Sequence, residues 1–331
     1  MVNIQFPDGA VRSYEQGITP MAVAKGISEG LAKKVIAASI DGVISDASTS
    51  INKDAALKLI TWDDADGKST FWHSTAHLLA EAVEATFPGV KFWVGPAIDR
   101  GFYYDMDLGG KTISEEELSN LEKKMGELAK QNNIFIRKQI SKGDAIAYFT
   151  EKGDEYKLDL LQGLTDGEIS FYTQGAFTDL CRGPHIPHTG LIKAIKLTSI
   201  AGAYWKGDEK NKQLTRVYGV SFPNQKELDE HILMLEEAKK RDHRKLGKEL
   251  GIFTFDDSVG PGLPLWMPNG TVIIEELERL AKETENAAGY KRVVTPHIAK
   301  ESLYITSGHL PYYQESMYPP MELEGVKYYL K

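Results

Sequence analysis

The sequence predicts an α+β protein built from several domains, and three observations support this prediction. First, its 331 residues exceed what one hydrophobic core usually organises. Second, short strand-like stretches separated by glycine turns fill residues 1–62, whereas longer helical stretches follow them. Third, the composition changes at a polar, turn-rich segment, residues 63–69, and again at a Gly- and Pro-rich segment after residue 250.

Residues 1–62 are predicted to form a small α+β domain with the hairpin–helix–strand order of a ubiquitin-like β-grasp. Thr19 followed by Pro20 is a typical helix start, and Asp41-Gly42 is a typical hairpin turn. The expected elements are strands Val2–Phe6 and Val11–Tyr14, a helix from Pro20 to about Glu29, a hairpin of Val35–Ile40 and Val43–Ile44, and a closing strand Ala56–Ile60. No pattern here indicates catalysis, so we expect a docking or spacer module.

Residues 63–223 are predicted to form a second α+β domain, which a linker over residues 63–69 connects to the first. Ser114, followed three residues later by Glu117, predicts a capping box at a helix start. The expected elements are helices Trp72–Ala85 and Glu115–Asn132, strands Phe92–Val94, Gly101–Tyr104 and Ile134–Ile140, a helix ending near Lys152, and a strand near Tyr156–Leu158.

Two stretches of this second domain concentrate side chains that can carry chemistry. His73 and His77 are four residues apart on a predicted helix, so they share one face of it. Cys181, the only cysteine of the chain, and His185 have the same spacing beside Asp179 on a Gly-Pro turn. These groups suit proton transfer, pocket building or zinc ligation. A histidine pair at helical spacing can also be an incidental part of a core, and the spacing alone does not decide.

Residues 224–250 are predicted to form one long helix, and residues 251–331 begin another domain. The second half of the helix is basic, which indicates either a solvated helix face or contacts with RNA phosphates. The basic residues are Lys239, Lys240, Arg241, Arg244, Lys245 and Lys248. The following domain is expected to contain a helix, Thr271–Ala288, and a strand within Gly289–Pro296.

Charge and composition exclude several classes of protein. A net charge of −8 disfavours indiscriminate coating of nucleic acid but leaves room for a local basic surface. One cysteine excludes an internal disulfide framework. No apolar run approaches the roughly 20 residues that span a bilayer, and the N-terminus lacks the features of a secretory signal. We therefore expect a cytoplasmic protein with no membrane partner.

Four segments occur in an order that resembles the bacterial-type threonyl-tRNA synthetases. They are HSTAHLLAEAV from His73, VGPAIDRGFYYD from Val94, DLCRGPH from Asp179 and AGAYWKGDEKNKQLTRVYG from Ala201. The resemblance runs from Met1 to Lys331. It implies a TGS domain at 1–62, an editing domain at 63–223, a linker helix at 224–250 and the N-terminal part of a class II catalytic domain at 251–331. Within that last part, the helix, strand and proline near 271–296 look like motif 1, a dimer-interface element.

The resemblance also implies a function and a role for each site residue. The longer protein would attach threonine to its tRNA with ATP, and the editing domain would hydrolyse the tRNA when serine is attached by mistake. By position in the family motifs, His73 and Lys157 would activate and orient water. The residues that would shape the pocket and bind the seryl group and terminal ribose are His77, Tyr104, Asp179, Cys181 and His185, with Asp179 as the anchor of the substrate ammonium. The residues expected to contact tRNA are Lys240, Arg241, Arg244 and Lys245.

The resemblance implies no cofactor for editing. His73, His77, Cys181 and His185 would suit tetrahedral zinc, as in the related editing domains for alanine, but Lys157 and Asp179 fit the metal-free version. We find no match to motif 2 or motif 3. The sites for ATP and structural zinc are therefore expected beyond Lys331, so the chain is expected to be the N-terminal part of a longer ligase. That ligase would bind tRNA by its acceptor end and form a homodimer through the motif 1 region.

Two other functions remain open at this point. The chain can be an adaptor whose TGS module docks on RNA or a partner while the His/Cys site is inactive, or it can be a freestanding aminoacyl-tRNA deacylase. The motif 1-like segment argues against the freestanding deacylase, which has no need of it. Deacylation activity separates the adaptor from the synthetase.

Overall fold

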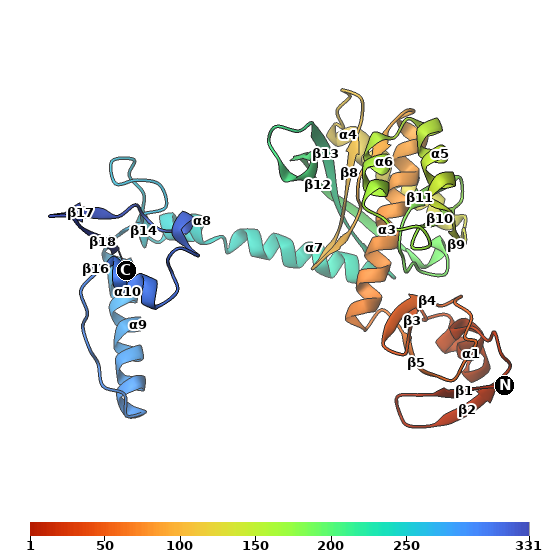
Figure 1. Ribbon diagram of the computed structural model, residues 1–331, viewed down its shortest axis with the longest axis horizontal. Coiled ribbons are helices and arrows are strands. Elements are labelled where there is room, and N and C mark those ends of the chain that lie inside the picture. The colour runs from red at the N-terminus through yellow and green to blue at the C-terminus, as the bar shows by residue number, and fades with distance from the viewer. Residues whose placement is uncertain (331) are drawn as a thin grey trace. The chain divides into compact units, whose positions relative to one another are not determined.

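The computed structural model describes residues 1–330. The chain divides into two compact units, the first of them Met1–Glu236 and the second beginning at Glu237 (Figure 1). The first unit contains both predicted α+β domains. We propose that the boundary between these two domains lies after residue 62. In the described part of the chain, no helix has the length and apolarity that a membrane crossing requires.

The first sheet has the strand order β2-β1-β5-β3-β4, with β1 and β5 parallel and the other pairs antiparallel. The Thr19 side chain accepts a hydrogen bond from the Ala22 N–H, which confirms the predicted helix start. The elements are β1 (Val2–Gln5), β2 (Val11–Tyr14), α1 (Pro20–Ile27), α2 (Glu29–Ala32), β3 (Ala37–Ile40), β4 (Val43–Asp46) and β5 (Ala55–Ile60). The helix α1, followed by the short α2, packs on a mixed five-stranded sheet, which is the β-grasp arrangement expected from the sequence.

The predicted linker at 63–69 is wrong, because α3 already begins at Ala65 and continues to Thr86. Gly67 lies so close to the preceding turn that a Cβ atom there would be 1.8 Å from the Thr61 carbonyl oxygen. Ile36 and Ile60 of the first sheet also belong to the hydrophobic cluster that surrounds α3. The polar composition of this segment reflects a helix start at the surface rather than a flexible connection.

The second part of the first unit packs α3 against α4 and a twisted sheet of order β12-β13-β8-β6, with β7 also paired to β8. A separate sheet has the order β11-β10-β9. The capping box of Ser114 and Glu117 is confirmed. The elements are β6 (Lys91–Phe92), β7 (Ala97–Ile98), β8 (Gly101–Asp107), α4 (Glu115–Lys130), β9 (Ile136–Gln139), α5 (Lys142–Lys152), α6 (Glu155–Gln162), β10 (Ser170–Gln174), β11 (Phe177–Leu180), β12 (Ala194–Tyr204) and β13 (Gln213–Phe222).

The strand predicted near Tyr156–Leu158 is wrong, because these residues lie in α6. The Asp154 side chain accepts hydrogen bonds from the backbone N–H groups of Tyr156 and Lys157, so it caps the helix. Aspartate at an N-cap satisfies donors that have no partner within the helix. This correction matters for the site, because the cap fixes the first turn of the helix that carries Lys157.

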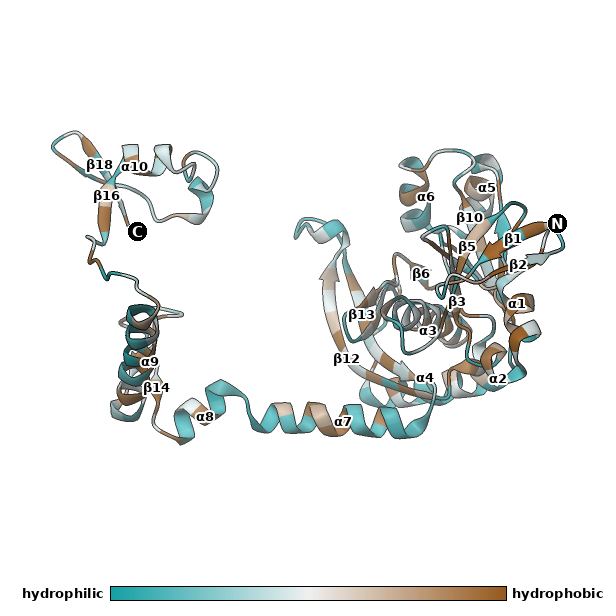
Figure 2. Ribbon diagram, turned by 90° about the horizontal axis from the view of Figure 1, so that it is seen from below, coloured by the Kyte–Doolittle hydropathy of each residue, from teal (hydrophilic) through white to brown (hydrophobic). Residues whose placement is uncertain are grey.

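The single long helix predicted over 224–250 is also wrong, because it divides into α7 (Gln225–Lys240) and α8 (His243–Glu249). The Asp242 side chain accepts a hydrogen bond from the Arg244 N–H, so a new helix starts there. Figure 2 shows that α7 is largely hydrophilic, and only Leu228 is buried on it.

The second unit holds a three-stranded sheet of order β16-β18-β17 and a helix α9 (Pro268–Ala287). The strand predicted within Gly289–Pro296 is absent from the described chain, and Val293 and Val294 are 79% and 85% exposed. A strand forms only where the chain pairs with a neighbouring strand, and the strand pairings of the described residues do not include residues 289–296. The other elements are β14 (Phe253–Thr254), β15 (Leu265–Trp266), β16 (Ile298–Lys300), α10 (Glu301–Thr306), β17 (Met321–Leu323) and β18 (Val326–Leu330).

Candidate active site

The predicted site residues meet at a cavity of about 300 Å³ in the first unit. The loop after β6 forms one wall, through Trp93, Gly95 and Pro96. Six of the seven predicted residues line the cavity, namely His73, His77, Tyr104, Lys157, Asp179 and Cys181. The seventh, His185, is buried directly behind them, with its ring stacked on that of His73 at 4.6 Å between centroids. Segments more than 100 residues apart in sequence thus form one site.

The His73 ring is held by a close backbone approach. Its Nδ1 lies 3.0 Å from the carbonyl oxygen of Gly95, which can only accept, so Nδ1 carries the proton. Gly95 has to be glycine, because a Cβ atom there would lie 2.3 Å from the Tyr104 ring. The Nε2 lone pair of His73 therefore points away from Gly95 toward Cys181 Sγ, 3.0 Å distant.

A second hydrogen-bond network gives His185 the same tautomer. Ser74 Oγ donates to the Thr70 carbonyl at 2.8 Å and accepts from the Ile186 N–H at 3.0 Å. Its only hydrogen is thus engaged, so the contact of 3.0 Å with His185 Nδ1 is donated by the imidazole. The Nε2 lone pair of His185 consequently also points to Cys181 Sγ, at 3.3 Å.

Two imidazole lone pairs therefore converge on one thiol, which has a single hydrogen to donate. His77 lies beside them, and its buried Nδ1 has no hydrogen-bond partner among the described residues. One ligand atom from each of His73, His77, Cys181 and His185 lies within 4.8 Å of the others. This donor set fits a tetrahedral metal ion. Without a metal ion, the thiol can donate to only one of the two imidazoles, so the Nε2 lone pair of the other can accept a hydrogen bond from a water molecule.

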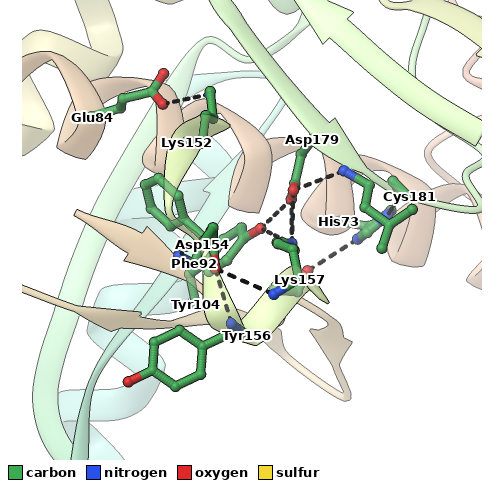
Figure 3. Close-up of polar contacts among 12 residues, drawn as sticks. His73, Glu84, Phe92, Tyr104, Lys152, Asp154, Tyr156, Lys157, Asp179 and Cys181 are labelled. Carbon is green, nitrogen blue, oxygen red and sulfur yellow. Dashed lines mark hydrogen bonds and ion pairs between the residues drawn. The ribbon is translucent and has the colours of Figure 1, made fainter. Parts of the chain in front are cut away.

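The opposite side of the cavity is a buried ion pair (Figure 3). Lys157 Nζ lies 2.7 Å from Asp179 Oδ1 and 2.9 Å from Oδ2, and Tyr104 Oη donates to the same carboxylate. Both charged side chains are less than 5% exposed. Removal of one partner from such a pair typically costs about 3–5 kcal/mol, because the remaining charge is buried without compensation. The pair fixes the position of the Lys157 ammonium within the cavity wall.

Burial dominates the protonation of the site. It lowers the pKa of His73 and, together with the adjacent His73, lowers the pKa of His77 to about 3. The pKa of His185 is also well below its ordinary value because of burial. Burial raises the pKa of the Cys181 thiol to about 12. Burial alone would raise the pKa of Asp179, but Lys157 holds it below the ordinary value. At neutral pH the imidazoles and the thiol are therefore uncharged, and Asp179 is ionised.

Sequence reasoning missed three residues that position this site, Ser74, Gly95 and Asp154. Ser74 lies inside the HSTAH stretch, so its proximity to both histidines was visible, but its bond to His185 spans 111 residues. Gly95 lies inside the quoted motif VGPAIDRGFYYD, but nothing in that motif indicates that its carbonyl oxygen contacts His73, 22 residues away in sequence. Asp154 is of a residue type that favours helix N-caps, and this preference is the signal in the sequence that indicates a helix start there.

The basic residues predicted to contact tRNA lie around the junction of α7 and α8 and are exposed. Each has an acidic neighbour in the same segment. The pairs are Lys240–Glu237 at 2.7 Å, Arg241–Glu237 at 4.0 Å, Arg244–Asp242 at 2.9 Å and Lys245–Glu249 at 3.8 Å. Exposed ion pairs of this kind contribute little to stability. A phosphate group can therefore replace the acidic side chain as the partner of each basic residue.

Comparison with known proteins supplies relatives over the whole chain. The TGS domain family matches residues 2–61, and the Threonyl and Alanyl tRNA synthetase second additional domain matches residues 169–218. The threonine–tRNA ligase of Cytophaga hutchinsonii is 60% identical over 333 residues, which cover all of this chain and 52% of the relative. Those of Porphyromonas gingivalis and Flavobacterium psychrophilum are 54% and 50% identical, and in each the aligned region covers all of this chain and 51% of the relative.

The second matched family includes β10, β11 and the Cys181–His185 turn, so it covers the part of the cavity wall formed by residues 179–183. The chain spans about half the length of the curated relatives that it matches. Over its entire length the chain is thus 50–60% identical to about half of these threonine–tRNA ligases, and it contains matches to the TGS domain and to the threonyl and alanyl tRNA synthetase second additional domain.

Proposed function

We propose that this chain hydrolyses the ester between serine and the terminal adenosine of a threonine-specific tRNA. It would do so within a longer class II synthetase that attaches threonine to the same tRNA with ATP. The observation that carries the proposal is one cavity lined by the uncharged His73 imidazole, the Lys157 ammonium and the only cysteine of the chain.

A separate hydrolytic site compensates for the limited ability of a binding pocket to distinguish serine from threonine. Threonine and serine differ by one methyl group, and such a difference supports only about 1–3 kcal/mol, or roughly 10–200-fold discrimination. A ligase for threonine therefore charges some tRNA with serine. A second site that hydrolyses the serine ester removes this error, and a cavity of about 300 Å³ suits a small aminoacyl group.

The residues can divide the reaction as follows. His73 Nε2 accepts a proton from water as the water oxygen attacks the ester carbonyl carbon. The ammonium of Lys157 has three N–H groups, which can donate to the two oxygens of Asp179 at 2.7 and 2.9 Å and to Tyr104 Oη at 3.4 Å. The N–H group in the longest of these contacts can turn to the developing oxyanion and stabilise it. The bond between the carbonyl carbon and the ribose oxygen then breaks, and the His73 imidazolium returns its proton to that oxygen.

The role expected for Asp179 changes in the light of its contacts. Its two oxygens already accept from Lys157, from Tyr104 Oη and from the Leu180 N–H. A substrate ammonium could bind Asp179 only if Lys157 moved away. We propose instead that Asp179 holds Lys157 in place, and that His77, Cys181 and His185 form the wall against the seryl side chain.

The same donor set fits zinc, so the metal-free mechanism needs a separate test. His73, His77, Cys181 and His185 would hold the ion. When bound, it would supply a water of lowered pKa. We favour the metal-free site, because Lys157 and His73 together already provide a proton acceptor and an oxyanion donor. ATP and a structural zinc are proposed for the full-length enzyme, outside the residues of this chain.

The partner proposed for the chain is the acceptor end of the tRNA, with phosphate contacts from Lys240, Arg241, Arg244 and Lys245. We further propose that the full-length protein acts in the cytoplasm and forms a homodimer through the segment around α9. The exposed valines after α9 support the dimer, because an apolar segment of this kind is suited to an interface.

The deciding experiment incubates the purified chain with threonine-specific tRNA charged either with serine or with threonine. We expect release of serine at a rate above spontaneous hydrolysis and little release of threonine. Binding of the tRNA without hydrolysis would favour the adaptor function instead. Equal hydrolysis of both esters would contradict an editing role, because an editing site has to spare the correct product.

A further inference from the structure

Asp46 links the first sheet to the candidate active site. It is the last residue of β4, within the domain that the sequence suggests is only a docking module, and it is 9% exposed. Its Oδ1 accepts the backbone N–H of His185 at 2.8 Å, and its Oδ2 accepts the hydroxyl of Tyr172 at 2.7 Å. Both donors lie more than 120 residues away in sequence.

These two contacts hold the turn that carries the Cys/His part of the site. The Tyr172 ring lies edge-on to the His185 imidazole, at 4.5 Å between centroids. Its hydroxyl lies directly against Gly183, where a Cβ atom would be only 2.0 Å from Oη. The Gly183 N–H in turn donates to Cys181 Sγ at 3.2 Å. One carboxylate thus reaches both the backbone of His185 and the ring packed beside it.

The other contacts of His185 act on its ring rather than its backbone. Ser74 fixes Nδ1, and Phe135 stacks on the ring at 4.8 Å with an interplanar angle of 7°. Asp46 is the acceptor that the structure gives to the His185 N–H. The ring plane and the backbone of His185 are therefore positioned by different domains.

We propose that Asp46 is a positioning residue for the hydrolytic site, so that docking of the β-grasp domain sets the placement of His185 and Cys181. This inference rests on the function proposed above. A hollow of about 380 Å³ borders both Asp46 and His185. Water can therefore replace part of the lost hydrogen bonding, and we expect removal of the carboxylate to reduce activity without abolishing it.

The test compares Asp46→Ala with Asp46→Asn and with a matched control. Asparagine keeps an oxygen for the His185 N–H, and its amide can donate to Tyr172 Oη. The control Asp54→Ala removes two hydrogen bonds to Asn3 within the same domain and does not touch the site. For Asp46→Ala we expect a roughly tenfold lower kcat for seryl-tRNA hydrolysis with an unchanged KM, since a hydrogen bond to a charged group is involved. Asp46→Asn and Asp54→Ala should retain kcat within about twofold of the parent.

A second readout does not depend on activity. Cys181 is the only thiol, so its rate of alkylation by iodoacetamide reports the local geometry of the turn. We expect Asp46→Ala to raise this rate severalfold and the other two variants to leave it unchanged. An Asp46→Ala protein that folds with parental kcat and alkylation would overturn the inference. So would an equal loss in Asp54→Ala, which would indicate general instability of the domain. If the parent chain has no hydrolase activity, the function fails, while alkylation still tests the positioning role.

Discussion

At the scale of single residues, the chemistry depends on uncharged imidazoles beside a fixed ammonium. The tautomers of His73 and His185 are set by Gly95 and Ser74, and both leave Nε2 free on the side of Cys181. Because these bonds orient the lone pairs before substrate binds, the site needs little rearrangement for proton transfer.

His73→Ala should lower the rate of seryl-tRNA hydrolysis by about 10²–10⁴-fold, the range typical of a general acid–base group. Single-turnover deacylation measures this loss. His231→Ala, on α7, serves as the control because it removes an imidazole from the same unit outside the cavity. Parental activity in His73→Ala would show that another group activates the water. His73 is a better test than Lys157, whose removal also leaves Asp179 buried and unpaired.

The metal question can be decided at Cys181. If the site binds zinc, Cys181→Ser should release the metal and destabilise the domain, because zinc affinity depends on the thiolate. We expect the metal-free result, in which Cys181→Ser unfolds at nearly the parental temperature and only turnover changes. Elemental analysis should then find well under one zinc per chain, and hydrolysis should survive EDTA. Activity lost on chelation and restored by zinc would contradict this expectation.

Acid should destabilise the metal-free chain through His77. Its pKa is about 3 in the folded protein because of burial and of His73, against about 6.5 when unfolded. Between these values the unfolded state binds more protons, so the free energy of unfolding falls as pH falls, by up to about 1.4 kcal/mol per pH unit for this group. Urea unfolding in EDTA at pH 7 and pH 5 should reveal the loss. His77→Gln should reduce this pH dependence, and an unchanged dependence would assign it to other groups.

At the scale of elements, the site is built where β8, which supplies Tyr104, and two further short segments meet one long helix. The helix α3 supplies His73, Ser74 and His77, α6 supplies Lys157, and β11 with the following turn supplies Asp179, Cys181 and His185. The cap at Asp154 also accepts the Phe92 N–H at 3.1 Å, so it ties the start of α6 to β6. Since Asp154 also accepts the Lys157 N–H, the position of Lys157 is fixed relative to the β6 segment that leads into the cavity wall.

The basic junction of α7 and α8 can be tested as an element. Replacing Lys240, Arg241, Arg244 and Lys245 by Gln should weaken tRNA binding and flatten its salt dependence, since each lost phosphate contact lowers the log–log slope by about 0.7–0.9. Titrations at several salt concentrations measure this slope. The control replaces Lys111, Lys123, Lys124 and Lys130 by Gln, which changes net charge equally. An unchanged slope in the first variant would mean that these residues form only a solvated face.

At the scale of the whole molecule, the two units differ in how their apolar residues are covered. The first unit buries a continuous cluster around α3, whereas α9 of the second buries only Gly270. The chain spans about half the length of its curated relatives. Hydrolysis is therefore proposed for the first unit, and ligation for the full-length protein.

The chain by itself is expected not to catalyse threonine-dependent exchange of pyrophosphate with ATP, because its sequence has no match to motifs 2 and 3 of class II synthetases. The same preparation should hydrolyse seryl-tRNA, which serves as the positive control for folding. Exchange above background would contradict the proposed division between the two activities.

The sequence by itself determined the parts of this protein that depend on neighbouring residues. The β-grasp strands, the Thr19 and Ser114 caps and the shared face of His73 and His77 follow from local propensity and helical spacing. Family motifs added Tyr104, Lys157 and Asp179. Local reasoning failed where packing competes with propensity, as at the start of α3, where Gly67 lies against Thr61, and in residues 289–296, which join no strand of the described chain.

Only the tertiary structure decided how the side chains of the site are oriented. The bond from Ser74 to His185, the bond from His73 to Gly95 and the bond from His185 to Asp46 each join segments that no local pattern relates. Hydrogen bonding and burial set the tautomers, the neutral imidazoles and the ionised Asp179, and both depend on which groups the fold brings within about 3 Å of one another. The sequence identifies which ionisable groups are present, but their protonation states and orientations are determined only by the packing of the folded chain.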